Sequence, residues 1–161
     1  MKKLLLLLLC VPLIGFGQQT YIPDDNFEAY LESNGMGNGI PNDDYVLHSN
    51  IYMATNLDVS NKNIIDLTGI EGFYSLEYLY CYSNQLTSID ITQNIFLEEL
   101  ACNDNNLSSL DVSNNSDLNY LDCTTNNLSS LDVTQNDSLR SLYCSSNQLT
   151  TLDVSNNILL E

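Results

Sequence analysis

A repeat of 21 residues fills the second half of the chain and constrains its fold more than any other feature. Four successive units begin at Leu76, Leu97, Leu118 and Leu139 and read LEYLYCYSNQLTSIDITQNIF, LEELACNDNNLSSLDVSNNSD, LNYLDCTTNNLSSLDVTQNDS and LRSLYCSSNQLTTLDVSNNIL. A fixed period of this size indicates a solenoid, in which each unit forms one coil and packs against its neighbours. We therefore expect function on an extended surface rather than in a pocket of convergent catalytic groups.

Each unit contains two short stretches in which apolar and polar residues alternate. Leu79 and Cys81 alternate with tyrosines, which is the period of a strand with one buried face. Ile89 and Ile91 form the second stretch, and each of the two stretches is followed by an asparagine. Because this half-unit pattern recurs about every ten or eleven residues, no room remains for a helix of ordinary length. We predict a β-rich solenoid whose coils consist of two extended segments joined by asparagine turns.

The first 17 residues have the pattern of a signal peptide. Lys2 and Lys3 precede an apolar stretch at 4–14, and Gly-Phe-Gly at 15–17 supplies the small residues that a signal peptidase reads. We place cleavage after residue 17 and expect a location outside the cell or on its outer surface. No second apolar segment approaches the roughly 20 residues of a membrane span, so no membrane insertion is expected after cleavage.

Residues 18–53 do not repeat and are predicted to form an N-terminal cap. Asp25 and Glu28 have the spacing of a capping box, which predicts a short amphipathic helix at 25–34. Residues 45–53 are predicted to add an extended segment. The first coil of a solenoid has an open apolar end, and a terminal cap is needed to cover it.

Residues 54–161 form the predicted repeat array. A degenerate entry unit at 54–75 precedes regular units at 76–96, 97–117, 118–138 and 139–159, and Leu160 occupies the first position of another unit. A solenoid that stops there presents an apolar face and unpaired strand edges. We therefore expect an open, truncated C-terminal end, with further sequence downstream.

The chain is strongly acidic, which excludes several classes of partner. It has 21 Asp and Glu residues against four Lys and Arg, a formal charge of −17 that becomes −19 when Lys2 and Lys3 are removed. Such a surface repels phosphate backbones and anionic membrane faces, so no nucleic acid partner is expected. A solvated exterior accounts for the charge, and attraction to cations or to a basic partner is the alternative.

Residues for the common catalytic sites are scarce, and we expect no enzyme. His48 is the only histidine, which leaves no His-activated nucleophile and no two-His metal site. Glu98 and Glu99 are adjacent and would face opposite ways on a strand, so they do not form the carboxylate pair of a glycoside hydrolase.

The repeat pattern LxxLxCxxNxLxxLDVSxN resembles the leucine-rich repeat family in its short, 21-residue bacterial form. The segments YIPDDNFEAYLESNGMGNGIPNDDYV and IIDLTGIEGFYSLEYL are similar to secreted repeat proteins of the Bacteroidetes, and the latter also resembles the internalin-like entry into a repeat array. The resemblance covers nearly the whole mature chain. It implies a curved solenoid that serves protein–protein or surface recognition.

Because successive coils stack about 4.8 Å apart, equivalent residues form columns. Two kinds of column are predicted to be structural. Parallel cysteines at this spacing neither meet the roughly 3.8 Å between Cβ atoms of a disulfide nor converge on zinc, so buried free thiols are expected. Asparagines tolerate left-handed backbone and bond to turn amides. These columns are Cys81, Cys102, Cys123 and Cys144; Asn84, Asn105, Asn126 and Asn147; and Asn94, Asn115, Asn136 and Asn157.

A column of aspartates is predicted to point outward, at Asp58, Asp90, Asp111, Asp132 and Asp153. Like charges about 5 Å apart repel by roughly 1 kcal/mol per neighbouring pair even in water. Hydration with hydrogen bonds from nearby Ser and Thr hydroxyls offsets this repulsion. The alternative is a weak calcium ladder at Asp90, Asp111, Asp132 and Asp153, since calcium prefers oxygen ligands; no other cofactor is expected.

The exposed positions of the first strand vary while their neighbours repeat, and several are tyrosine, a residue favoured at interfaces. We predict that a protein or glycan ligand binds there, and the candidate residues are Tyr78, Tyr80, Tyr82, Glu99, Asn103, Tyr120, Asp122 and Tyr143. Two alternatives stay open. The array is a passive spacer of a larger enzyme or adhesin whose working domain lies beyond residue 161, or it is a structural element stabilised by calcium.

Overall fold

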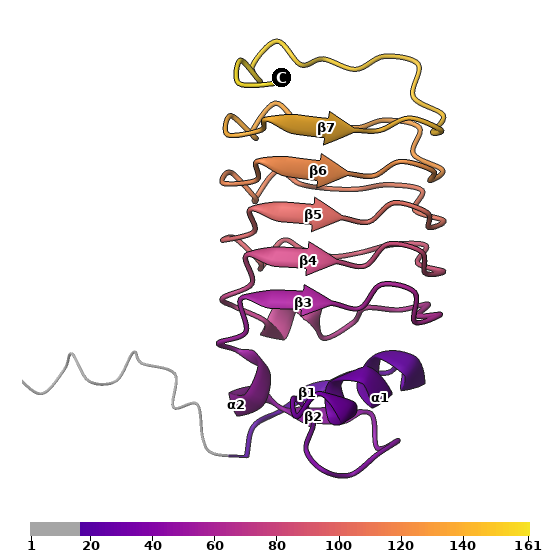
Figure 1. The fold of residues 1–161 in the computed structure, drawn as a ribbon, viewed down its shortest axis with the longest axis vertical. Helices are drawn as coiled ribbons and strands as arrows, with labels where there is room; N and C mark the ends of the chain where they lie inside the picture. The colour runs from indigo at the N-terminus through magenta and orange to yellow at the C-terminus, as the bar shows by residue number, and fades with distance from the viewer. Residues whose placement is uncertain (1–16) are drawn as a thin grey trace, which may run out of the picture.

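The computed structural model describes residues 17–161, so the predicted signal peptide lies outside the described residues except for Gly17. A parallel five-stranded sheet runs along one side of a stack of coils (Figure 1), which confirms the predicted β-rich solenoid. Its strands, in order, are β3 (Asn56–Asp58), β4 (Tyr78–Tyr80), β5 (Glu99–Ala101), β6 (Tyr120–Asp122) and β7 (Ser141–Tyr143).

The sheet register follows the sequence period. Tyr78 pairs with Glu99, Glu99 with Tyr120 and Tyr120 with Ser141, so residues 21 apart lie beside each other on adjacent strands. The central residue of each strand is a leucine that points into the coil, and Leu100 is fully buried. The period therefore sets both the core and the exposed columns.

The second extended segment predicted in each coil is not part of a sheet in the described residues. Leu110 and Val112 are buried as their alternation predicts, but the segment forms no strand in the described residues. The reason lies in its hydrogen bonds. Asp111 Oδ1 accepts from the Ser113 N–H at 2.9 Å. Because a side chain of the same coil uses this donor, the donor is not available to a ladder with the next coil.

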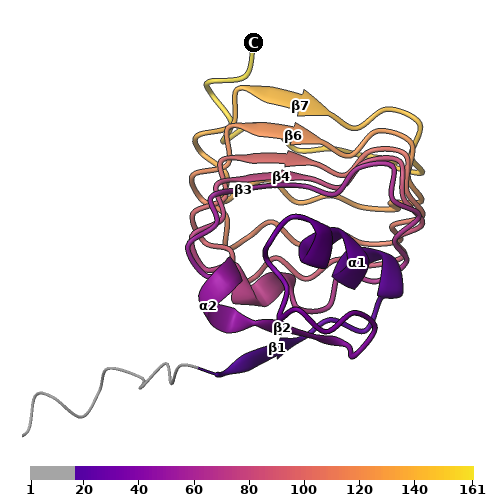
Figure 2. The same ribbon diagram turned by 60° about the horizontal axis from the view of Figure 1, so that its bottom comes forward.

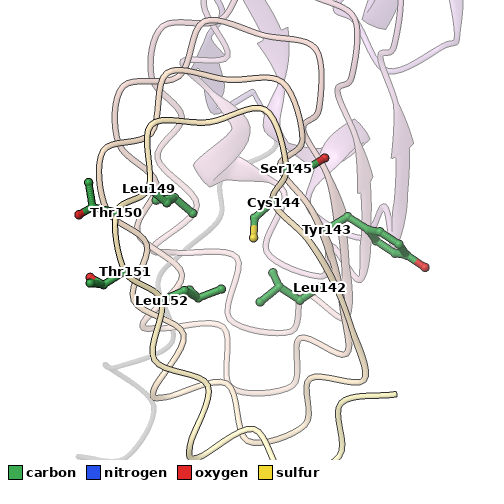
Figure 3. Close-up of a pocket in the computed structure, with 8 residues that line it drawn as sticks. All are labelled: Leu142, Tyr143, Cys144, Ser145, Leu149, Thr150, Thr151 and Leu152. Atoms are coloured by element: carbon green, nitrogen blue, oxygen red, sulfur yellow. The ribbon is translucent and has the colours of Figure 1, made fainter.

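Leucine, isoleucine, valine and cysteine side chains fill a continuous core along the inside of the coils. The last coil is less covered. Leu142, Cys144, Leu149 and Leu152 line a hollow of about 500 Å³, and Figure 3 shows their side chains pointing inward. Leu152 is 36% exposed.

The N-terminal cap covers the other end of the stack (Figure 2). Strand β1 (Gln19–Tyr21) pairs antiparallel with β2 (Tyr45–Leu47). Helix α1 (Asp25–Ser33) contacts the entry coil, where the ring of Phe27 stacks on that of Phe73. The extended segment predicted at 45–53 ends at Leu47, because helix α2 (His48–Ile51) follows at once. A short 3₁₀ helix, η1 (Ile70–Gly72), closes the entry coil. In the described residues no helix is long and apolar enough to cross a membrane.

Helix α1 begins at the predicted residue and ends one residue earlier than predicted, but its N-cap is not Asp25 as the capping-box pattern predicts. The N-cap is Asp24, whose Oδ1 accepts from the N–H groups of Asn26 at 2.9 Å and Phe27 at 3.0 Å. Asp25 is the first helical residue and is exposed. Pattern reasoning misses this because two aspartates stand side by side, and both have a plausible cap position.

Asp24 also connects the cap to the first coil. Its second oxygen, Oδ2, accepts from the N–H groups of Ile65 at 2.7 Å and Asp66 at 3.2 Å. The carboxylate is thus shared between a helix terminus and a turn about 40 residues away, and it is only 5% exposed.

Glu28, the other half of the predicted capping box, has a different role. Its buried carboxylate accepts from the N–H groups of Asp43 at 3.1 Å and Asp44 at 3.2 Å. It holds the loop between α1 and β2 instead of reaching back to the helix terminus.

Candidate functional site: the exposed face of the strands

The outward side chains of β4 to β7, together with the residue two positions after each strand, form a surface that we call the strand face. The parallel register arranges it in three rows across the strands. Its members are Tyr78, Glu99, Tyr120 and Ser141; Tyr80, Ala101, Asp122 and Tyr143; and Tyr82, Asn103, Thr124 and Ser145.

A hollow of about 390 Å³ lies in the middle of the strand face. Ala101 stands between Tyr80 and Asp122 on the neighbouring strands and is only 7% exposed. Because the Ala101 side chain is a single methyl group, the larger side chains around it extend further from the sheet and form the sides of the hollow. The hollow is lined by Ala101 and six of the eight predicted binding residues: Tyr80, Tyr82, Glu99, Asn103, Tyr120 and Asp122.

The two other predicted binding residues lie outside the hollow. The Tyr78 hydroxyl donates to Glu98 Oε2 at 3.3 Å, and the negative charge of Glu98 raises the pKa of Tyr78. Tyr143 is 53% exposed, and its ring packs against that of Tyr120 with centroids 5.7 Å apart. Tyr143 therefore buttresses the wall of the hollow, whereas Tyr78 is held by a carboxylate outside it.

Inside the hollow, aromatic and acidic groups are already joined. The Tyr80 hydroxyl donates to Glu99 Oε2 at 2.6 Å, and this bond with partial burial raises the pKa of Tyr80 to about 12. Asp122 Oδ1 accepts from the Thr124 N–H at 2.9 Å. Burial and the charge of Asp122 raise the pKa of Tyr120. Tyr80 and Tyr120 are therefore neutral hydroxyl donors at neutral pH, and they stand beside the carboxylates of Glu99 and Asp122.

The sequence gives little reason to select Ala101 among the strand-face positions. The available signal was its size, since no other position of this face in the four units holds a small apolar residue. The small size of Ala101 becomes informative only when the strand register is known, because the register places large side chains on both sides of it.

The aspartate column forms a series of turns along the return side of the coils. Asp90 Oδ1 accepts from the N–H of Thr92 at 3.0 Å and from its hydroxyl at 2.7 Å, and these bonds lower the pKa of Asp90. Asp111, Asp132 and Asp153 each accept from the N–H two residues on, and their pKa values are lowered by the same kind of contact. The described residues contain no group of three or more His, Cys, Asp or Glu side chains placed to hold a metal ion.

Asp58 does not belong to this column, contrary to the prediction. It is the last residue of β3 and pairs with Tyr80 in the sheet. Asp66 makes the equivalent turn with Thr68 and shares a hollow of about 210 Å³ with Asp90. The entry unit does not follow the 21-residue spacing, so counting along the sequence misplaces its aspartates.

The cysteine column lies inside the coils as free thiols. Cys81, Cys102 and Cys123 are buried, and Cys144 in the last coil is half-buried. Burial raises the pKa of Cys81 and of Cys123 to about 12 and that of Cys102 well above its ordinary value. Thiols in this state are poor nucleophiles, because the thiolate is the reactive form.

The asparagine after each strand bonds to the backbone of two coils. Asn126 Oδ1 accepts from the Leu107 N–H at 2.9 Å, and its Nδ2 donates to the carbonyls of Cys102 and Cys123 at 3.0 and 3.1 Å. Equivalent bonds are made by Asn84, Asn105 and Asn147. The residue with left-handed backbone is the one before the asparagine, such as Thr125 at φ 54°, so the asparagine contributes its side-chain bonds to the turn and not this backbone conformation.

The second asparagine column also bonds across coils. Asn115 Nδ2 donates to the carbonyls of Ile91 at 3.3 Å and Asn94 at 2.8 Å. The other members, Asn94, Asn136 and Asn157, likewise donate to two carbonyls of the preceding coil. The first column thus uses both polar side-chain atoms on backbone groups, whereas in the second column only the Nδ2 groups do so and the buried Oδ1 atoms have no hydrogen-bond partner among the described residues.

Comparison with known proteins agrees with this architecture. No family model matches the chain. Internalin J of Listeria monocytogenes is 39% identical over 74 residues, which are 46% of this chain and 8% of that protein. The structure described as the functional domain of InlJ from Listeria monocytogenes, which includes a cysteine ladder, superposes with a TM-score of 0.82 at 39% identity, covering 91% of this chain and 33% of that one.

Two further solved structures share the fold. A leucine-rich repeat protein of Leptospira interrogans has a TM-score of 0.64 at 27% identity, covering 66% of this chain and 29% of that one. Internalin C2 of Listeria monocytogenes has a TM-score of 0.66 at 25% identity, covering 71% of this chain and 50% of that one. This chain thus spans half or less of the length of each relative. By fold it is a leucine-rich repeat solenoid, and in sequence it is similar to the internalins.

Proposed function

We propose that this chain is a recognition module, exported by its signal peptide, that binds a protein ligand through the strand face. The observation that carries the proposal is the contrast between the two sides of each strand. The inward leucine of β4 to β7 is the same in every coil, whereas the outward residues differ and include five tyrosines. These outward side chains do not pack in the core, and many of them are aromatic with a polar tip. Such a surface is suited to an interface.

Similarity to the internalins supports recognition rather than catalysis. The strand face is also continuous from β4 to β7, with a hollow at its centre and a ring pair, Tyr120 and Tyr143, at its edge. Rigid aromatic anchors beside a preformed hollow are a common arrangement of binding hot spots.

The test compares two matched variants on arrays of extracellular proteins and of glycans. Tyr80→Ser with Tyr120→Ser removes aromatic area from the strand face. Ile95→Ser with Phe96→Ser removes exposed apolar area from a turn, where these side chains are 49% and 54% exposed. Circular dichroism checks that both variants keep the fold.

We expect that the full chain binds members of the protein array, that the strand-face variant loses roughly tenfold or more of its affinity, and that the turn variant binds as the wild type does. Equal binding by all three chains would show that the strand face is not the interface. A passive spacer, the alternative, predicts no ligand on either array.

A further inference from the structure

We propose that the hollow above Ala101 receives an arginine side chain from an extended, basic segment of the protein ligand. This inference rests on the proposed function and specifies the chemistry of the partner. The hollow combines a small apolar floor, tyrosine walls and two carboxylates, and each part corresponds to one feature of a guanidinium group.

The floor and walls fit a flat, weakly hydrated cation. Ala101 lies at the bottom with 7% exposure, and Tyr80, Tyr82 and Tyr120 line the sides. A guanidinium stacks on aromatic rings and is less strongly hydrated than an ammonium. Its apolar methylene stem can lie against the alanine methyl while the charged group meets the walls.

The carboxylates offer acceptor atoms in the same hollow. Glu99 receives the Tyr80 hydroxyl on Oε2, and Asp122 receives the Thr124 N–H on Oδ1. Among the described residues, Glu99 Oε1 and Asp122 Oδ2 have no hydrogen-bond partner. The existing bonds hold both carboxylates in place, and an arginine with five N–H donors can reach more than one acceptor.

The chain itself has almost no cation with which to neutralise these groups. In residues 17–161 the basic side chains are Lys62 and Arg140, against 21 acidic residues. The Lys62 ammonium lies over the ring of Tyr30, 5.5 Å from its centroid, at the cap end. Arg140 precedes β7 at the position equivalent to Glu98 and Asn119, one residue before the strand face. Charge complementarity thus favours a basic partner over an acidic or neutral one.

The geometry also favours an extended segment. The hollow lies on a sheet whose strands are three residues long and which is open to solvent on this face. Alternate side chains of an extended peptide point to one side about every 7 Å. One arginine can therefore enter the hollow while its neighbours along the peptide contact the flanking tyrosines.

The test uses a blocked peptide of alternating glycine and arginine, titrated calorimetrically into the full chain at physiological salt, with a glycine–lysine peptide for comparison. We expect the arginine peptide to bind more tightly than the lysine peptide. The double variant Glu99→Gln with Asp122→Asn keeps an acceptor oxygen on each side chain and should bind roughly tenfold more weakly. Ala101→Phe, which fills the hollow without a change of charge, should abolish the preference for arginine.

The matched control is Asp117→Asn with Asp137→Asn, which removes the same charge from exposed turns outside the strand face. It should bind as the wild type does. Equal weakening in both double variants would mean that the peptide senses only net charge, and the site would be refuted. Binding by Ala101→Phe with the arginine preference intact would also refute it.

The outcome separates this inference from the proposed function. If the strand-face variant loses a ligand on the protein array while the arginine peptide fails to bind, the recognition module stands and the arginine site falls. If only glycans bind, and do so through the same residues, the basic partner is wrong. If nothing binds through this face, both fall together.

Discussion

Asp24 is expected to contribute more to stability than any other carboxylate of the N-terminal cap, and its neighbour Asp25 almost nothing. Loss of an N-cap side chain costs about 1 kcal/mol, and Asp24 Oδ1 accepts from two N–H groups of helix α1. Its Oδ2 accepts two more from Ile65 and Asp66. Hydrogen bonds to a charged group contribute about 1.5–3 kcal/mol each when buried, but these two residues are exposed, so water recovers part of the loss.

We therefore expect Asp24→Ala to lower the free energy of unfolding by about 2–4 kcal/mol. Asp24→Asn keeps one acceptor oxygen and should lose only one of the two pairs of bonds, a cost of about 1–2 kcal/mol. Asp25→Ala is the matched control. It removes an exposed carboxylate and should change stability by no more than about 0.5 kcal/mol.

The assay is urea unfolding followed by circular dichroism, together with amide hydrogen exchange. Exchange is needed because repeat proteins can open locally, so that a single unfolding energy is not always defined. In Asp24→Ala the amides of Asn26, Phe27 and Ile65 should lose protection together, while those of the distant strand β6 should not. Equal costs for the two alanine variants, or a larger cost for Asp25→Ala, would refute the assignment of the cap to Asp24.

Four further predictions concern the coils. Leu121 is fully buried, so Leu121→Ala should lower the free energy of unfolding by about 2–5 kcal/mol. Leu142 is half-buried at the equivalent position, so Leu142→Ala should lower it clearly less in the same urea assay. Equal losses in the two variants would contradict the packing described. Iodoacetamide at mildly alkaline pH should modify half-buried Cys144 before Cys81, as mass spectrometry of the native protein would reveal. Because burial raises the pKa of Cys81 from 9.0 to about 12, its contribution to stability is complete below pH 9 and is lost as the pH rises from 9 toward 12. If the aspartate column collects calcium, which is the alternative to a hydrated column, millimolar calcium should raise the melting temperature and Asp132→Asn should reduce the rise. No shift in the wild type would refute the calcium ladder.

The features that could be predicted from the sequence are those that the period itself encodes. Leu79 and Cys81 alternate with tyrosines, and their burial follows because a strand places alternate residues on opposite faces. Six of the eight predicted binding residues meet in one hollow, because residues 21 apart are neighbours when coils stack in register.

The features that could not be predicted depend on choices between local alternatives. Asp24 and Asp25 are both plausible N-caps, and the decision is made by Ile65 and Asp66, whose N–H groups meet only the former. Thr125 has the left-handed backbone of the turn, and the side-chain amide of Asn126 after it bonds to backbone groups of two coils. In both places contacts between residues distant in sequence complete a structure that the local sequence alone leaves open.

The same period that builds the fold also decides what lies beside Ala101. Tyr80 and Asp122 flank it only because one whole unit separates each of them from it. Insertion of a single residue in a coil would disturb the alternation and turn apolar side chains outward, at a high cost. Loss of a whole unit would not. Removing residues 76–96 would join equivalent positions and keep every column, yet it would place Asp58 where Tyr80 stands and replace an aromatic wall with a carboxylate. Removal of a whole unit is therefore expected to alter recognition with little effect on folding. The arginine site thus depends on which units are neighbours in the stack, and not only on the residues within one unit.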